Sequence, residues 1–318
     1  MSSSLPPPSR EEMERLARHS DWRPADIRRS LTETVYADRH LWLQFAHYVL
    51  LGAGVAFLLS GVVFFFAYNW AALPRLAKLG TAGGLLGVTG LVALLAPLRD
   101  GLRRVLLTAT VVLIGVLLAV LGQVYQTGAD SFQLFLLWSV FALPWVALIA
   151  YPPLWLIFVV LLNTTLILYT QQVGVAWEVL ATSIVLFVFN LIVWAVVYNL
   201  RSHDTAFSWL IKLIALWTAT VATVNTATGS LGDNLPSLGL ALLLATGLYV
   251  YWVRLGLVER SVFYLAVVGC SVIFTVLFLF LRAVDGAWAL FVLGFALVGS
   301  ISLLVRYLQS LNRSWRED

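Results

Sequence analysis

Long apolar runs alternate with short polar breaks from Leu41 almost to the C-terminus. The runs are about 17 to 22 residues long, the length that crosses bilayer hydrocarbon as an α-helix. Barrel strands would alternate apolar and polar positions, whereas residues 111–120 are apolar almost throughout. The pattern predicts an all-α, polytopic transmembrane helix bundle over residues 41–307. Its ten predicted spans are 46–67, 79–97, 105–122, 132–150, 153–170, 179–199, 207–226, 237–255, 261–281 and 287–307.

The two ends of the chain have a different pattern. Residues 1–40 alternate charged and apolar positions at helical spacing, and their arginines and acidic residues balance. We predict a cytosolic N-terminal segment with short charged helices at 1–40 and a cytosolic tail at 308–318. A docking site for a partner is the alternative interpretation of residues 1–40.

The composition excludes several classes of protein. Of the 318 residues, 61% are hydrophobic and 11% are charged, whereas an average soluble domain has about 25% charged residues. The chain is therefore not an ordinary water-soluble enzyme. A single cysteine, Cys270, excludes a disulfide framework and a thiolate metal cage.

The placement of the basic residues predicts the orientation in the membrane. With the N-terminus in the cytosol, the outer loops hold only Arg75, Lys78 and Arg282 of the 20 lysines and arginines. Basic residues are enriched in cytoplasmic loops. We therefore expect a protein of the bacterial inner membrane with both termini in the cytoplasm. The net charge of +4 is explained by this topology, so we expect no nucleic-acid partner.

Two polar segments stand out on the predicted outer face, residues 68–75 and 122–130. Gly122 and Gly128 are expected to adopt turn conformations, and Asp130 to cap the following helix. The side chains predicted to form a periplasm-facing binding site are Asn69, Trp70, Arg75, Gln123, Tyr125, Gln126 and Asp130, with Glu178, Asp233 and Arg282 at its rim. The alternative is a purely structural loop with an Arg75–Asp130 ion pair.

Polar residues inside the spans are few. No acidic residue lies deep in a span, which argues against a carboxylate-driven pump. Hydrogen bonds between helices are expected for Asn163, Thr164, Asn190 and Asn225. Close helix packing is expected at Gly80, Gly83, Gly84 and Gly87. An interfacial belt is expected for Trp42, Trp70, Trp155, Trp177, Trp209, Trp252 and Trp288.

The two outer polar segments also carry a family resemblance. The runs 64–70, 73–75, 122–130 and 135–138 read FFFAYNW, LPR, GQVYQTGAD and FLLW. Together they resemble the domain of unknown function 2157 family of predicted prokaryotic inner-membrane proteins, over about residues 10–170. The resemblance implies a location in the membrane, but it implies no particular reaction. For some relatives it also implies a second membrane protein as a partner.

Three functions remain open from the sequence. The first is a non-enzymatic protein that binds or transports a small molecule of unknown identity, which requires a polar cavity reaching inward from Gln123 and Tyr125. The second is a structural or assembly subunit, which requires a packed interior. The third is a lipid-modifying enzyme, which needs converging titratable groups. The sequence has no catalytic set, cofactor signature or metal-site spacing, so we expect no enzymatic activity, cofactor or metal.

Overall fold

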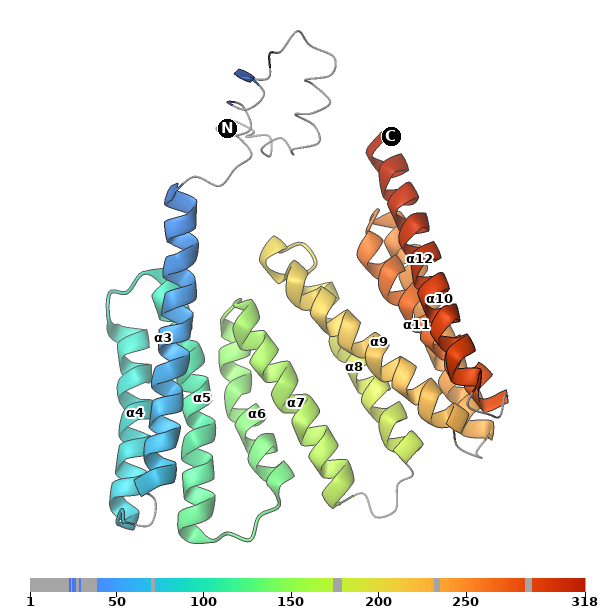
Figure 1. Cartoon of the computed structure of the whole chain (residues 1–318). Helices are drawn as coiled ribbons and strands as arrows, with labels where there is room; N and C mark the ends of the chain where they lie inside the picture. The colour runs from blue at the N-terminus through green and yellow to red at the C-terminus, as the bar shows by residue number, and fades with distance from the viewer. Residues whose placement is uncertain are drawn as a thin grey trace. The chain divides into compact units, whose positions relative to one another are not determined.

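The computed structural model describes residues 39–69, 72–173, 179–231, 235–283 and 288–317, together with Arg23, Ala25, Asp26 and Arg29. Within these residues, ten helices are long and apolar enough to cross a membrane (Figure 1). The ten predicted spans are therefore confirmed. Most of the predicted N-terminal helices lie outside the described residues. Among the few residues described there, the Arg23 N–H donates to Asp26 Oδ2 at 3.1 Å and forms a local turn.

The helices extend a few residues beyond the apolar runs. They are α3 (Arg39–Asn69), α4 (Arg75–Leu95), α5 (Asp100–Tyr125), α6 (Ser131–Leu148), α7 (Pro152–Gln172), α8 (Val179–Arg201), α9 (Ser208–Leu231), α10 (Leu235–Val258), α11 (Val262–Ala283) and α12 (Trp288–Glu317), with a 3-10 turn, η2 (Thr205–Phe207), before α9. The last helix continues through residues that the hydropathy pattern assigns to a tail. The turn between α6 and α7 is short because Pro152 and Pro153 occupy the first helical positions of α7, where a missing N–H costs nothing.

The chain divides into two units, Met1–Thr81 and Ala82–Asp318. The first contains α3 and the start of α4. None of the described side chains of α3 is buried, and Phe57 and Leu58 are among the most exposed apolar residues. This exposure fits a helix whose solvent is lipid hydrocarbon.

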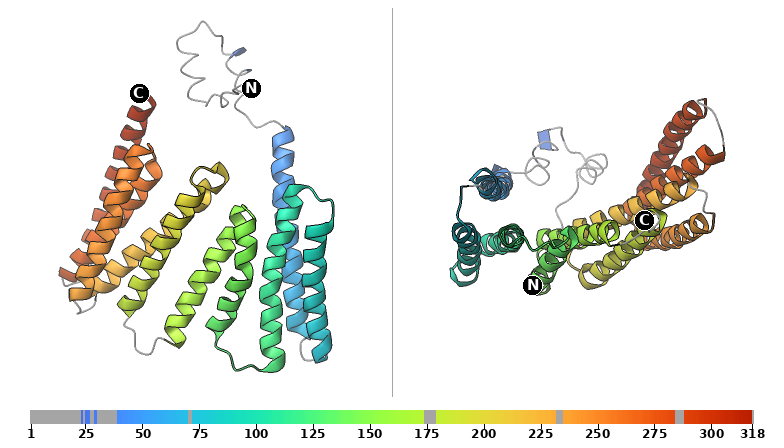
Figure 2. Two further views of the ribbon diagram at one scale, coloured as in Figure 1. Left: turned by 180° about the vertical axis from the view of Figure 1, so that it is seen from behind. Right: turned by 90° about the horizontal axis from the view of Figure 1, so that it is seen from below.

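The second unit holds the core. Successive helices run in opposite directions (Figures 1 and 2). Contacts join α5 to α6, α6 to α7, α7 to α8, and α11 to α12, while α9 contacts α8, α10 and α11. Because three helices surround it, α9 contributes more buried residues than any other described helix.

An aromatic cluster forms part of this core. The ring of Trp194 on α8 lies 5.3 Å from that of Trp252 on α10 and 5.1 Å from that of Tyr198. Trp252 is fully buried and Trp155 on α7 nearly so. The prediction that these two tryptophans belong to an interfacial belt is therefore wrong, because neighbouring helices cover them; Trp42, Trp209 and Trp288 are exposed, and Trp70 and Trp177 lie outside the described residues.

Glycines show where the helices of the second unit approach closely. A Cβ added to Gly115 on α5 would overlap the indole of Trp138 on α6, whose Nε1 donates to the Val111 carbonyl at 2.7 Å. In contrast, a Cβ on Gly83, Gly84 or Gly87 would meet nothing within 4 Å. The close packing expected at these α4 glycines is therefore not found within their own unit.

Contacts at the helix ends define two levels of the second unit. At one end, the Tyr198 hydroxyl donates to Glu259, and the Arg260 guanidinium donates to the Trp315 carbonyl at 3.2 Å. We call this the basic end, because most lysines and arginines of the second unit lie at or near it. They are Arg99, Arg103, Arg104, Arg201, Lys212, Arg254, Arg260, Arg306, Arg313 and Arg316. At the opposite end, the Phe132 N–H donates to Gln172 Oε1 at 3.1 Å.

Candidate functional site

The segment that joins α5 to α6 is a short, exposed loop. The helix runs through Gly122, whose carbonyl accepts the N–H groups of Gln126 and Thr127. Gln126 has a φ of 45° and Gly128 a φ of 63°. The turn conformation predicted for Gly128 is confirmed. The one predicted for Gly122 is wrong, because Gln126 supplies the left-handed residue that ends the helix.

Asp130 occupies the N-cap position of α6, but its side chain makes no capping hydrogen bond. The predicted cap is therefore wrong in its chemistry. One of the free N–H groups at this helix start, that of Phe132, instead donates to Gln172 on α7. Sequence reasoning did not find Gln172, because the two residues are 40 positions apart.

The predicted outer site is defined only in part. Gln123, Tyr125, Gln126 and Asp130 are all exposed on the second unit, and Arg75 is exposed on the first. The predicted Arg75–Asp130 pair joins two units and stays a prediction. Trp70, Glu178 and Asp233, and the side chain of Asn69, lie outside the described residues.

A hydrogen-bond cluster around two buried asparagines, which was not predicted as a site from the sequence, joins three central helices. Asn190 on α8 donates from Nδ2 to Asn163 Oδ1 on α7 at 2.7 Å, and Trp217 on α9 donates from Nε1 to the same oxygen at 3.3 Å. We call Asn163, Asn190 and Trp217 the amide cluster. The predicted helix-to-helix role of the two asparagines is confirmed. Thr164 donates only to the Val160 carbonyl of its own helix, so its predicted interhelical bond is not formed.

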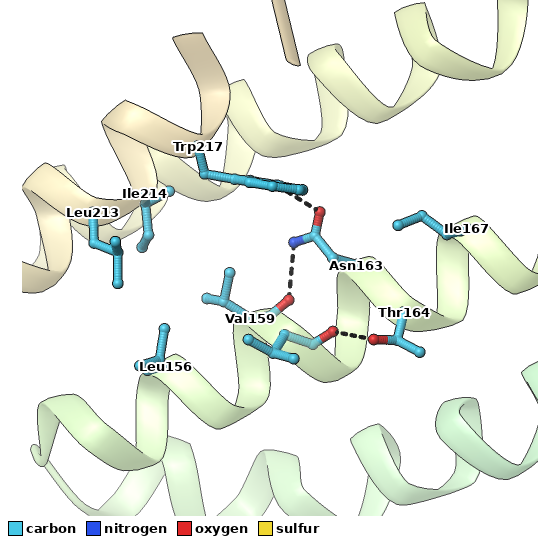
Figure 3. A pocket seen from close by; sticks show the side chains of 9 residues that line it. Leu156, Val159, Asn163, Thr164, Ile167, Leu213, Ile214 and Trp217 are labelled. Atoms are coloured by element: carbon cyan, nitrogen blue, oxygen red, sulfur yellow. Dashed lines mark hydrogen bonds between the residues drawn. The ribbon is translucent and has the colours of Figure 1, made fainter. Parts of the chain in front are cut away.

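An apolar groove lies beside the amide cluster, between α7 and α9 (Figure 3). Its volume is about 370 Å³. The lining side chains are Leu156, Val159, Val160, Asn163, Thr164, Ile167, Leu213, Ile214 and Trp217. Asn163 and Trp217 stand near the middle of their helices, so the groove reaches the central level of the membrane-spanning segments.

Asn163 offers little free hydrogen-bonding capacity to the groove. Its Oδ1 already accepts two hydrogen bonds, and its Nδ2 donates to the Val159 carbonyl at 2.9 Å. A carboxamide has two acceptor sites and two donors, so a single donor remains. The groove therefore suits hydrocarbon better than a polar solute.

A second set of polar contacts joins α9 to α10 and α11. Thr226 and Thr275 are 3.2 Å apart between their hydroxyl oxygens. Nearer the helix ends, the Arg282 guanidinium on α11 donates to the carbonyl of Ser230 at 2.7 Å and to that of Gly229 at 3.5 Å. Arg282, predicted at the rim of the outer site, thus caps the C-terminus of α9.

The side chains that line the groove are neutral. No group of three His, Cys, Asp or Glu side chains gathers among the described residues. The groove is lined by carboxamide, hydroxyl, indole and aliphatic groups, and none of these side chains titrates near pH 7. The described groove can therefore bind and position a molecule, but it contains no general acid or base for a reaction.

Comparison with known proteins adds a family over part of the chain. No curated protein and no solved structure matches it. The family match falls within the stretch in which the sequence resemblance was expected. Residues 27–155 match the family described as "Predicted membrane protein (DUF2157)".

Proposed function

We propose that this protein is a non-enzymatic, multi-pass inner-membrane protein that binds the hydrocarbon chain of a membrane lipid in the α7–α9 groove. The observation that carries the proposal is an apolar groove of about 370 Å³ beside a hydrogen-bonded amide cluster at the middle of two spans. Small-molecule sites have volumes of about 300 to 1,000 Å³ and a mostly apolar lining.

The length of the groove supports a lipid chain as the occupant. Its α7 lining runs from Leu156 to Ile167, which is about 16 Å at the rise of an α-helix. Half of the bilayer hydrocarbon is about 15 Å thick. The groove is therefore about as long as one acyl chain, and its lining is centred near the middle of α7.

The distribution of charge supports the inner-membrane orientation. Positions of basic residues gather at the end of the second unit where α12 finishes, whereas Arg282 lies at the opposite end. Because lysine and arginine are enriched in cytoplasmic segments, this distribution supports a cytosolic C-terminus. An even number of spans then returns the N-terminus to the same side.

A second candidate is an assembly subunit that contacts another membrane protein. It is favoured by the packed aromatic interior between α8, α10 and α11, where Trp194, Trp252 and Tyr264 meet. The exposed side chains of Gln123, Tyr125, Gln126 and Asp130 would then contact a periplasmic part of the partner, or a small molecule that the partner delivers.

Filling the groove tests the lipid-binding function. The protein is placed in nanodiscs of phosphatidylcholine whose acyl chain carries a photo-crosslinking group, and the labelled peptides are mapped by mass spectrometry. We expect labelling of α7 and α9 at the groove in the wild type. Val160→Trp should remove most of this labelling, because Val160 lines the groove and is 53% exposed.

Leu243→Trp is the matched control, because Leu243 lies on α10, outside the groove lining, and is 69% exposed. It adds the same indole to a surface that faces lipid. Equal labelling of the groove in wild type and Val160→Trp, with both proteins folded, would show that no chain is bound there.

A further inference from the structure

Two arginines lie beside the start of α7 at the basic end. Arg104 is in the second turn of α5, and Arg201 ends α8. With Tyr151, which lies in the turn between α6 and α7, we call them the basic rim. Within the described part of the chain, neither arginine forms an ion pair.

Arg201 is held by aromatic rings and keeps its donors. Its guanidinium carbon lies 5.1 Å from the centre of the Trp155 ring and 5.2 Å from that of Phe207. Stacking of this kind orients the planar guanidinium without consuming its N–H groups. No described residue accepts a hydrogen bond from Arg201, and its Nε is buried without a partner. The side chain is therefore oriented to donate to an anion from outside the chain.

Arg104 brings positive charge to the turn between α6 and α7. Burial raises the pKa of the Tyr151 phenol, and the nearby charge of Arg104 lowers it by less. The neighbouring Arg103 belongs to a different contact, because it donates a long hydrogen bond to the Ala96 carbonyl at 3.4 Å, before the start of α5.

The backbone of the turn cannot serve an anion in place of these side chains. Pro152 and Pro153 have no N–H group, and the N–H groups of Leu154 and Trp155 both donate to the Tyr151 carbonyl, at 3.1 and 3.2 Å. The first helical turn of α7 is thus without free donors. An anion beside the start of α7 would therefore be bound by side chains such as the arginines and the Tyr151 hydroxyl, not by the N–H groups of this helical turn.

The basic rim lies near that end of the α7–α9 groove which is closer to the basic end. Trp155 directly precedes Leu156, which lines the groove. Phe207 ends the 3-10 turn η2 directly before α9, and Ile214 of the groove lining follows seven residues later. The Arg201 guanidinium lies over both of these rings. A molecule with its chain in the groove would carry its headgroup to the level of the arginines.

We propose that the basic rim binds the phosphate headgroup of an anionic phospholipid whose acyl chain lies in the α7–α9 groove. This inference rests on the proposed lipid-binding function and names the class of lipid. Two acidic residues lie near the rim in sequence, Asp204 and Asp100. The Asp204 carboxylate accepts the Ala206 N–H at 3.0 Å, and neither carboxylate forms an ion pair with a rim arginine among the described residues. At the cytoplasmic surface, each basic residue is worth about 1 kcal/mol toward an anionic lipid.

Competition between two lipids tests the proposal. Nanodiscs contain mostly phosphatidylcholine and a minor share of phosphatidylglycerol, each with a photo-crosslinking chain of distinct mass. We expect phosphatidylglycerol to be enriched on the groove peptides of the wild type. Arg201→Gln and Arg104→Gln should each lower this enrichment roughly fivefold. Arg104 is exposed, so its variant keeps the test valid if Arg201→Gln fails to fold.

Arg306→Gln is the matched control, because it removes the same charge from the basic end on α12, away from the rim. An equal loss of enrichment in this control, or no enrichment in the wild type, would overturn the inference. Loss of enrichment on adding millimolar inorganic phosphate would also overturn it, in favour of a free anion. If phosphatidylcholine labels the groove and phosphatidylglycerol is not enriched, only the headgroup site at the basic rim is refuted. If neither lipid labels the groove, the proposed lipid-binding function is refuted as well.

Discussion

The α5–α6 loop and the centre of the bundle use similar polar side chains in opposite environments. Around the loop, Gln123 in the last turn of α5 is followed closely by Gln126 and Asp130, and all three are exposed. In the bundle, Asn163 and Asn190 are 27 positions apart and share a buried hydrogen bond. A dense polar motif in sequence is therefore not a dense polar site in space. Isolated polar residues in apolar spans meet each other, because lipid offers them no alternative partner.

The strongest test of this comparison removes the charge that caps α9. Arg282→Met should lower the free energy of unfolding by roughly 2 kcal/mol, because the carbonyls of Gly229 and Ser230 lose a charged donor. Unfolding in mixed detergent micelles measures the change. Arg306→Met, at an exposed position of α12, is the control and should lower the free energy of unfolding much less. Similar losses in the two variants would indicate a general effect of removing positive charge.

Breaking the amide cluster should have the next largest effect. Asn163→Leu should lower the free energy of unfolding by about 1.5 kcal/mol, because Asn190 and Trp217 both lose their acceptor. Thr164→Val is the control: its hydroxyl bonds only within its own helix, and we expect a change below about 0.5 kcal/mol. A double-mutant cycle with Asn190→Leu should show coupling; additive losses would contradict the shared bond.

A smaller effect is expected where the two environments meet, at the start of α6. Gln172→Met removes the side-chain acceptor of the Phe132 N–H and should cost about 0.7 kcal/mol, since an ordinary hydrogen bond contributes about 0.5 to 1.5 kcal/mol. Gln171→Met changes the neighbouring exposed side chain in the same way and should be neutral. Thermal unfolding of the two variants side by side decides whether Gln172 supports the loop.

The smallest effect is expected inside the loop itself. Asp130→Ala should change the free energy of unfolding by less than about 0.3 kcal/mol, because the side chain makes no capping bond, whereas a working N-cap is worth about 1 kcal/mol. The same unfolding assay applies. A loss near 1 kcal/mol would show that the Asp130 side chain does cap α6 in the wild type. An unchanged free energy of unfolding would show that the wild-type carboxylate has no role as a cap.

Much of the fold could be predicted because the signals are local. Each span shows itself by its own length and apolarity, so all ten appear without knowledge of their neighbours. The environments of Trp155 and Trp252 could not be predicted in this way, because both stand near span ends and only adjacent helices decide whether they are covered. The same holds for Gly115, whose contact with Trp138 depends on how α5 and α6 are rotated.

The candidate site divides along the same line. That asparagines would join helices follows from the cost of a bare amide in hydrocarbon. That Asn163 would pair with Asn190 and accept from Trp217 does not follow. The groove and the basic rim each draw residues from helices that are separate in sequence, such as Tyr151 and Arg201, and no spacing along the chain indicates them.

The amino-acid sequence alone determined how often the chain crosses the membrane and where each helix runs, since burial of apolar surface in lipid acts on every span independently. Tertiary structure alone decided which polar groups are satisfied and where a groove remains. Once all spans are in lipid, hydrophobicity no longer selects one helix pair over another. Side-chain packing and hydrogen-bond geometry make that choice.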